Sequence, residues 1–147
     1  MICQLLEADF PAVKRIYGEA FDSIRNSLDD LQVSWDTRSR ENSYGIFTQD
    51  TLSGFVLGSF HKKSGSNLYI DYIAVDVKSR GQGLGTQLIH HLIDKCSREH
   101  RGMHLFPDSF ELAAWYKTFG FYETPDTKPV AGKPPYYLNW SPYSRRG

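Results

Sequence analysis

Hydrophobic and polar positions change their period several times along the chain, and each period predicts a different element. Residues 2–6 and 43–48 are typical of strands, and residues 52–60 alternate as a third strand, joined to the second by a hairpin at 49–51. Residues 68–75 are rich in tyrosine, isoleucine and valine, so they predict a further strand. The first half of the chain therefore predicts a sheet.

Helical periodicity lies before and after these strands. One predicted helix follows Asp9, which is placed to cap it, and carries Val13, Ile16, Tyr17 and Ala20 on one face. Residues 21–31 continue as a loop and a second helix. A longer helix buries a face whose members recur at three and four: Leu84, Leu88, Ile89, Leu92, Ile93 and Cys96.

The last third of the chain predicts shorter elements. Residues 103–106 form a strand, and residues 109–118 form a helix that ends before Gly120, which suits a helix C-terminus. Residues 121–124 and 136–140 are expected to form a final pair of strands. Since no repeat or long linker divides the sequence, residues 1–147 are expected to form one domain.

Composition narrows the classes of function. The chain has 147 residues, of which 40% are hydrophobic, and a formal net charge of zero, so neither disorder nor a nucleic-acid partner is indicated. Without a signal-like start or an apolar run of membrane length, we expect a soluble, cytoplasmic protein without a membrane partner. Cys3 and Cys96 are too few for a disulfide framework, and the histidines show no ligand spacing, so we expect no metal. Cys96 is expected to be a buried structural thiol.

The segment from Val75 to Thr86 holds the most specific signal, because a strand there runs into a glycine-rich turn that opens a helix. Gly81, Gly83 and Gly85 allow a sharp turn and leave backbone N–H groups uncovered at the end of the helix that attracts anions. The segment therefore predicts a phosphate cradle. A Cβ at Gly83 or Gly85 is expected to collide with the phosphate or the turn.

The spacing of the glycines distinguishes between known phosphate-binding signatures. The dinucleotide fingerprint G-x-G-x-x-G fails, because its last position falls on Thr86 or Leu88, and no Gly-Lys-Ser/Thr run exists for a nucleoside triphosphate. An ordinary glycine-rich turn remains the plain alternative. What is present is Arg80-x-x-Gly83-x-Gly85.

This pattern resembles the diphosphate-binding signature of the GCN5-related N-acetyltransferases (GNAT), Arg/Gln-x-x-Gly-x-Gly/Ala. Residues 113–121 resemble a second segment of that family, a helix whose Tyr116 lies four residues before the pair Gly120-Phe121. The order of the predicted elements is also similar to that of the family. The resemblance implies an α+β fold of α/β/α type, with a mixed, mostly antiparallel central sheet of six to seven strands and about four flanking helices.

The resemblance also implies where acetyl-coenzyme A binds as cosubstrate. Family positions that line the pantetheine arm and the acetyl carbonyl correspond to the strand residues Ile73, Ala74 and Val75. The diphosphate positions correspond to Arg80, Gly81, Gln82, Gly83, Leu84, Gly85 and Thr86. Ser109 stands where the family often has Asn, so its hydroxyl is the expected, shorter contact to the pantetheine arm.

Two residues are candidates for the chemistry that the resemblance implies. Asp71 is a carboxylate on a strand that should be covered, and family bases lie at the positions of Tyr69 and Asp71, so it is the candidate base; pairing with a nearby cation is the structural alternative. Tyr116 is the candidate acid for the departing thiolate; packing in the core is its alternative.

The resemblance implies an acyl-CoA-dependent enzyme, an N-acetyltransferase moving acetyl from acetyl-coenzyme A to a primary amine by direct attack in a ternary complex. A coenzyme-A-binding sensor or interaction module without turnover is the alternative from another class, and a dinucleotide oxidoreductase is disfavoured by the glycine spacing. The acceptor is expected to be a small-molecule or peptide amine, and the protein a monomer or homodimer.

Overall fold

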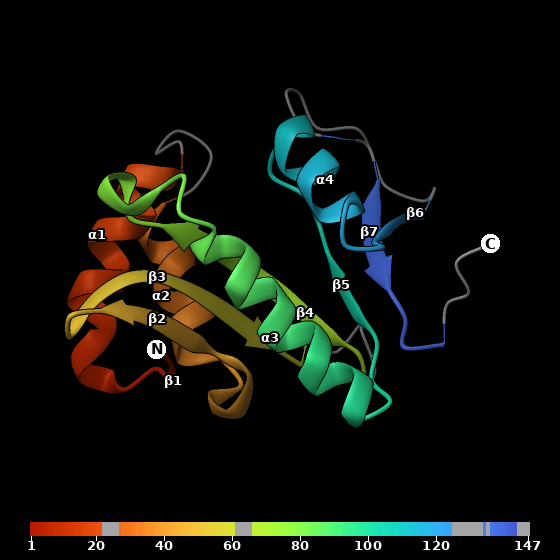
Figure 1. Ribbon diagram of the computed structural model, residues 1–147, viewed down its shortest axis with the longest axis horizontal. Helices are drawn as coiled ribbons and strands as arrows, with labels where there is room; N and C mark the ends of the chain where they lie inside the picture. The colour runs from red at the N-terminus through yellow and green to blue at the C-terminus, as the bar shows by residue number, and fades with distance from the viewer. Residues whose placement is uncertain (22–26, 61–65, 125–133, 135, 144–147) are drawn as a thin grey trace. The chain divides into compact units, whose positions relative to one another are not determined.

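The computed structural model describes residues 1–21, 27–60, 66–124, 134 and 136–143 (Figure 1). Its strands are β1 (Ile2–Gln4), β2 (Tyr44–Thr48), β3 (Thr51–Ser59), β4 (Leu68–Val75), β5 (Met103–Leu105), β6 (Tyr122–Thr124) and β7 (Tyr137–Trp140). Its helices are α1 (Phe10–Ala20), α2 (Leu28–Asp36), α3 (Leu84–Arg98) and α4 (Phe110–Lys117), with 3-10 turns η1 (Glu7–Asp9), η2 (Arg40–Asn42) and η4 (Val77–Ser79).

Within the described residues the strands form one seven-stranded sheet in the order β1-β2-β3-β4-β5-β7-β6. The pairs β1–β2, β2–β3, β5–β7 and β6–β7 are antiparallel, whereas β4 and β5 are parallel. A parallel pair needs a crossover, which α3 supplies between β4 and β5. The predicted fold class, a mixed and mostly antiparallel sheet with four flanking α-helices, is confirmed.

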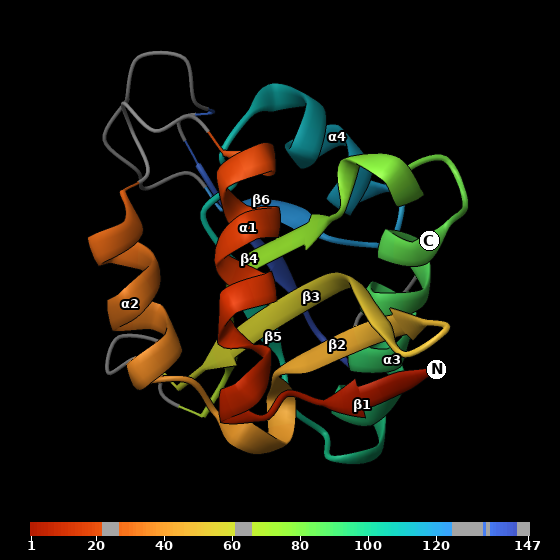
Figure 2. The same cartoon turned by 90° about the vertical axis from the view of Figure 1, so that its left-hand side faces the viewer.

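Contacts divide the chain into two compact units, residues 1–60 with 70–94 and residues 61–69 with 95–147. In the first unit, α1 and the first part of α3 cover opposite faces of β2 and β3 (Figures 1 and 2). One core joins α1 and α2 to this sheet through apolar side chains from each element, namely Leu5, Val13, Ile16, Tyr17, Leu31, Trp35, Leu52, Phe55, Leu57 and Ala74.

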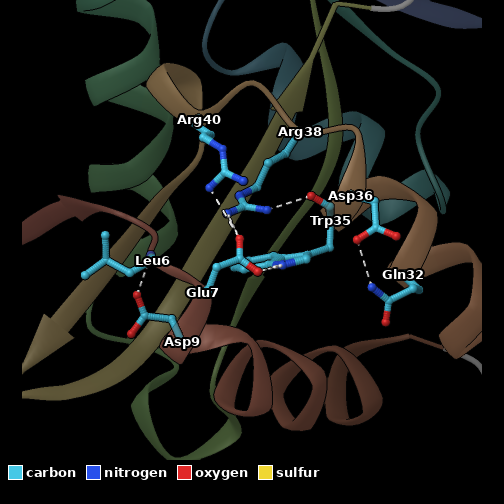
Figure 3. A network of polar contacts seen from close by, with 8 residues as sticks. All are labelled: Leu6, Glu7, Asp9, Gln32, Trp35, Asp36, Arg38 and Arg40. Carbon is cyan, nitrogen blue, oxygen red and sulfur yellow. Dashed lines mark hydrogen bonds and ion pairs between the residues drawn. The ribbon is translucent and has the colours of Figure 1, made fainter.

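A buried arginine packs against Trp35, a member of that core. The Arg38 guanidinium lies 3.7 Å from the ring centroid of Trp35, whose other neighbour is the stacked ring of Phe10 at 4.7 Å. Arg38 donates to Glu7 Oε2 at 2.7 Å, and Arg40 donates to the same oxygen at 3.3 Å (Figure 3). The hydrogen bond from Arg38, with a smaller one from the Trp35 indole, holds the pKa of Glu7 below its ordinary value. The carboxylate therefore compensates a guanidinium whose side chain is only 2% exposed.

In the second unit, β5, β7 and β6 pair in that order, and Tyr116 of α4 contacts Phe121, which leads into β6. The ring of Tyr116 lies 5.2 Å from that of Phe121, and Lys117 forms an ion pair with Glu123. Cys96, at the end of α3, is fully buried, and this burial raises the pKa of its thiol to about 11. The predicted buried thiol is confirmed.

Three local predictions need adjustment. Asp9 stands at the predicted N-cap position of α1, but its carboxylate makes no hydrogen bond to that helix; it accepts the N–H of Leu6 at 2.8 Å, because Glu7–Asp9 forms a separate 3-10 turn. The first strand is shorter than predicted for the same reason. The second helix extends to Asp36 instead of residue 31, since Trp35 is buried.

The predicted hairpin is present as a two-residue turn in which Gln49 and Asp50 both have positive φ, 50° and 63°. Such a turn matches the twist of the flanking strands. Gly120 also has the expected positive φ, 96°. Residues 61–65, in the connection between β3 and β4, lie outside the described residues.

No helix in the described segments combines the length and apolar character needed to cross a membrane. In the same segments, no three His, Cys, Asp or Glu side chains are grouped as metal ligands.

Candidate functional site

The glycine-rich segment begins with a firmly bonded stem, residues 76–79. The N–H of Asp76 donates to Ser53 O on β3 at 2.7 Å, and that of Ser79 donates to Asp76 O at 2.8 Å. The Asp76 carboxylate accepts the N–H of Lys78 at 3.2 Å. This hydrogen bond, with the charge of nearby Arg15, lowers the pKa of Asp76, whose side chain is mostly buried. The stem is therefore fixed to the sheet before the chain reaches the glycines.

The cradle, residues 80–86, differs from the stem in its exposed glycines and in N–H groups that are unbonded within the described residues. Gly81 and Gly83 have φ values of 82° and 77°, in the region that only glycine enters without strain, and residues 81–83 are exposed. The first hydrogen bond of the following helix runs from the N–H of Gln87 to Gly83 O at 3.0 Å. Among the described residues, no hydrogen bond accounts for the N–H groups of residues 81–86. These donors stand at the N-terminus of a 15-residue helix, where an anion is stabilised.

A Cβ built on Gly81 or Gly83 meets no protein atom within 4 Å. The expectation that a side chain at Gly83 would collide with the turn is therefore wrong; the backbone conformation, and not crowding by protein, requires glycine there. The open space in front of these two glycines leaves room for a diphosphate, so the residues present fit the group.

The other cradle positions take different roles. Arg80 is exposed, and its Nε donates to Val75 O at 3.1 Å, which folds its side chain back over the end of β4. Leu84 is buried and anchors the start of α3 in the core. Gln82 is exposed, whereas Gly85 and Thr86 are half-buried.

β4 leads into this segment, and its burial pattern changes midway. Leu68 and Ile70 are buried as in a regular alternating strand, but Asp71 and Tyr72 are both half-buried, and Ile73 and Ala74 are both buried. Val75, the last residue, is half-buried. The strand thus loses its alternation at the candidate base.

β3 approaches the end of β4 closely at Gly54. A Cβ at this position would lie 3.0 Å from Ala74 O and 3.3 Å from the Val75 side chain. Glycine at this point allows the two strands to approach without displacing the residues expected to line the pantetheine arm.

Asp71 has a partner that the sequence did not indicate. The hydroxyl of Ser59, the last residue of β3, donates to Asp71 Oδ1 at 2.6 Å. Ser59 is 3% exposed, so this hydrogen bond is shielded from water and its length is that of a charge-assisted bond. The carboxylate is held by a neutral hydroxyl on the neighbouring strand.

Tyr116 belongs to the second unit, and its side chain is only 3% exposed. Burial, with a smaller contribution from Tyr69, raises the pKa of its phenol well above the ordinary value near 10. The ring contacts Trp115 at 5.1 Å and Phe121 at 5.2 Å between centroids. The phenol is therefore firmly protonated near neutrality.

Ser109 caps α4, because its Oγ accepts the N–H of Leu112 at 3.1 Å. The expected contact to the pantetheine arm stays a prediction, and the hydroxyl oxygen already has this structural role.

His104 on β5 was not among the site residues predicted from the sequence. It lies directly opposite Tyr69 in the parallel ladder, with 5.1 Å between ring centroids, and 6.2 Å from Tyr137 on β7. His104 stands alone between buried Met103 and Leu105, so it formed no motif in the sequence. Because side chains alternate along a strand, it lies on the face opposite Met103 and Leu105, which is also the face of Tyr69. The structure thus groups Asp71 with the cradle in the first unit, and Tyr69, His104 and Tyr116 in the second.

Comparison with known proteins identifies a protein family and several solved structures with a similar fold. A family model described as "Acetyltransferase (GNAT) family" matches residues 2–121. A search of curated proteins gave no significant match. Similar solved structures include Arabidopsis thaliana Naa50 in complex with a bisubstrate analogue, CoA-Ac-MVNAL, with a TM-score of 0.74 and 21% identity over 96% of this chain and 97% of that one.

Two structures from Escherichia coli are similar to the same degree. The ribosomal-protein-S18-alanine N-acetyltransferase has a TM-score of 0.74 and 20% identity over 100% of this chain and 96% of that one. The GNAT family N-acetyltransferase YhbS, in complex with CoA, has a TM-score of 0.74 and 20% identity over 97% of this chain and 81% of that one. At these identities the likeness shows the fold.

Proposed function

The chain belongs to the acetyltransferase (GNAT) family, and on that premise we propose that it is an N-acetyltransferase, moving acetyl from acetyl-coenzyme A to a primary amine by direct attack in a ternary complex. One observation carries the proposal: the N–H groups of residues 81–86 have no hydrogen-bond partner among the described residues and stand at the start of a 15-residue helix. We treat residues 1–147 as a single acetyltransferase domain.

The cradle residues hold the diphosphate in this proposal. Gly81 and Gly83 supply the left-handed turn, and the backbone N–H groups up to Thr86 donate to the phosphate oxygens. Arg80 adds positive charge at the edge of the turn. Ile73, Ala74 and Val75 line the pantetheine arm, and Ser109 is a further contact. The cosubstrate supplies the activated acetyl thioester.

The chain's own groups then have three tasks: removing a proton from the amine, stabilising the oxyanion and stabilising the sulfur, which leaves as a thiolate and takes its proton from water. Asp71 accepts the proton, with its carboxylate oriented by Ser59. A backbone N–H in the last part of β4 faces the oxyanion. Tyr116 donates a hydrogen bond to the departing sulfur; because burial raises the pKa of its phenol, donation of a hydrogen bond is favoured over complete loss of the proton.

The α-amine of a peptide is the acceptor that we favour. An α-amine has a pKa of about 7.7–8.0, so roughly a tenth is neutral at pH 7, whereas a lysine side chain with a pKa of about 10.4 is neutral in roughly one molecule in 2,500. The names of two similar structures support a peptide or protein acceptor, since one contains the bisubstrate analogue CoA-Ac-MVNAL and the other is a ribosomal-protein-S18-alanine N-acetyltransferase.

Thiol release from acetyl-coenzyme A tests the proposal with two matched peptides. One has a free α-amine and no lysine; the other has the same length, a blocked α-amine and one lysine. Faster release with the free α-amine supports a peptide N-terminal acceptor, and faster release with the lysine peptide rejects it. Tight binding of coenzyme A without release for any peptide or small amine would favour a non-catalytic coenzyme-A-binding module instead.

A further inference from the structure

The stem of the cradle is held by a helix distant in sequence. Glu19, in the last turn of α1, accepts the N–H of Val77 through Oε1 at 3.2 Å. Its other oxygen, Oε2, accepts from Arg15 Nη1 at 3.2 Å. The same Arg15 nitrogen lies 3.6 Å from Asp76 Oδ1. Two residues of α1 therefore contact two consecutive residues of the stem.

This contact completes the hydrogen bonding of the stem. The N–H groups of Asp76, Lys78 and Ser79 are satisfied by Ser53 O, the Asp76 carboxylate and Asp76 O. Glu19 satisfies the remaining one, that of Val77. Four consecutive N–H groups are thus bonded shortly before the stretch from residue 81 to 86, whose N–H groups have no hydrogen-bond partner among the described residues. The stem can act as a fixed base for those donors only while all four bonds hold.

Charge supports the same assignment. Glu19 and Asp76 place two carboxylates beside a segment that is to receive an anion, and like charges would oppose binding. Arg15 bridges the two carboxylates and offsets their charge. Its side chain is 46% exposed and that of Glu19 is 30% exposed, so neither residue is part of the hydrophobic core. An ion pair this exposed adds little to stability, which leaves its geometry as its main contribution.

We propose that Glu19 and Arg15 are positioning residues for cosubstrate binding: from α1, they fix the stem so that the cradle N–H groups converge on the diphosphate. This inference rests on the proposed function, because it assumes that the cradle binds coenzyme A. Neither residue touches the diphosphate in this assignment. Their loss should weaken binding without altering the chemical step.

The experiment measures coenzyme A binding by calorimetry for variants at position 19. Glu19→Met keeps the length of the side chain but removes the acceptor, and we expect the Kd to rise about 3- to 10-fold, as for one lost hydrogen bond. Glu19→Gln retains an oxygen that can accept the Val77 N–H, so it should recover most of the affinity. kcat with both substrates saturating should stay within about twofold of wild type, since only the Kd depends on the stem.

Glu99→Met is the matched control. Glu99, the residue after α3, forms exposed ion pairs with Lys95 and Arg101, and its side-chain exposure of 36% is close to that of Glu19. It should bind coenzyme A like wild type. Arg15→Met, which retains the Glu19 acceptor but leaves two carboxylates beside the cradle, should weaken binding more at low than at high salt.

The outcomes separate the two proposals. If wild-type protein does not bind coenzyme A, the proposed function fails. If wild type binds and Glu19→Met binds equally well, the positioning role fails while the function stands. Hydrogen–deuterium exchange gives a second reading on folded protein: protection of the Val77 amide should fall in Glu19→Met and persist in Glu99→Met. Unchanged protection in Glu19→Met overturns the inference.

Discussion

The hydroxyl of Ser59 donates a 2.6 Å hydrogen bond to the carboxylate of Asp71, so the ends of the two residues meet across β3 and β4. Ser59 is the last residue of β3, and Asp71 lies where β4 loses its regular alternation. The hydrogen bond from the Ser59 hydroxyl fixes the orientation of this carboxylate oxygen. Asp71 is therefore oriented in a way that suits proton transfer.

Ser59→Ala should lower kcat about tenfold, because the lost hydrogen bond to a charged group releases the carboxylate from its orientation. Steady-state kinetics should show this with little change in the Kd for coenzyme A. Ser53→Ala is the control, since Ser53 is equally buried on the same strand and its hydroxyl bonds only weakly, at 3.4 Å, to Thr51 O.

A double-mutant cycle tests whether Ser59 acts through Asp71. Asp71→Asn should reduce kcat by more than Ser59→Ala, and adding Ser59→Ala to Asp71→Asn should have almost no further effect. Full additivity of the two substitutions would separate Ser59 from the base.

Tyr116→Phe should lower turnover by a factor of about 10 to 10,000 and leave coenzyme A affinity nearly intact. The hydroxyl is the only group removed, and the ring contacts with Trp115 and Phe121 remain. Since burial raises the pKa of the phenol, no alkaline loss of activity below about pH 10 should arise from its deprotonation. Wild-type turnover in the variant, with chemistry rate-limiting, would exclude Tyr116 from the mechanism.

Gly83→Ala should weaken coenzyme A binding about tenfold, because φ near 77° costs an L-residue about 1–2 kcal/mol and the turn would relax to avoid it. Calorimetry would measure the change. Gly18→Ala is the control: the new methyl group also meets no atom within 4 Å, but the residue lies in α1 without a positive φ. Equal affinities for the two variants would contradict the cradle.

Glu7→Gln should reduce stability at pH 7, and the reduction should become smaller at pH 3. Arg38 lowers the pKa of Glu7, so the stabilising contribution is present above the unfolded value of 4.5 and is lost as pH falls through the lower folded value. Urea unfolding at both pH values would show this as a larger decrease of the midpoint at pH 7 than at pH 3. Glu111→Gln, at an exposed acid in α4, should shift neither midpoint; a Glu7→Gln midpoint equal to wild type at pH 7 would show that Arg38 does not depend on this carboxylate.

The cradle could be predicted from the sequence because its determinants are local. Glycines at fixed spacing between a strand and a helix specify both a left-handed turn and open N–H groups, and the positive φ of Gly81 and Gly83 follows. The capping box of Ser27 and Asp30 marks the start of α2 locally, but its extension to Asp36 depends on the burial of Trp35, which is a tertiary contact.

Long-range partners could not be predicted in the same way. Val77 and Glu19 are separated by 58 positions, and Ser59 and Asp71 by 12 positions across two strands. Their pairing depends on the register of the sheet and on the packing of α1, which one sequence does not specify. Asp9 shows the same limit at short range. Its carboxylate could accept an N–H of α1 or the N–H at the start of the preceding 3-10 turn, and it accepts the latter, from Leu6.

Gly54 restricts which residues can be substituted at its position. With Ala74 O at 3.0 Å and the Ile46 side chain at 3.2 Å from any added methyl group, a larger residue must wedge the neighbouring strand outward. Because that strand carries the backbone from Asp71 to Val75, the displacement would misalign reacting groups even where the fold survives. Saturation mutagenesis would therefore find position 54 among the least permissive in the chain, although it supplies no side chain of its own.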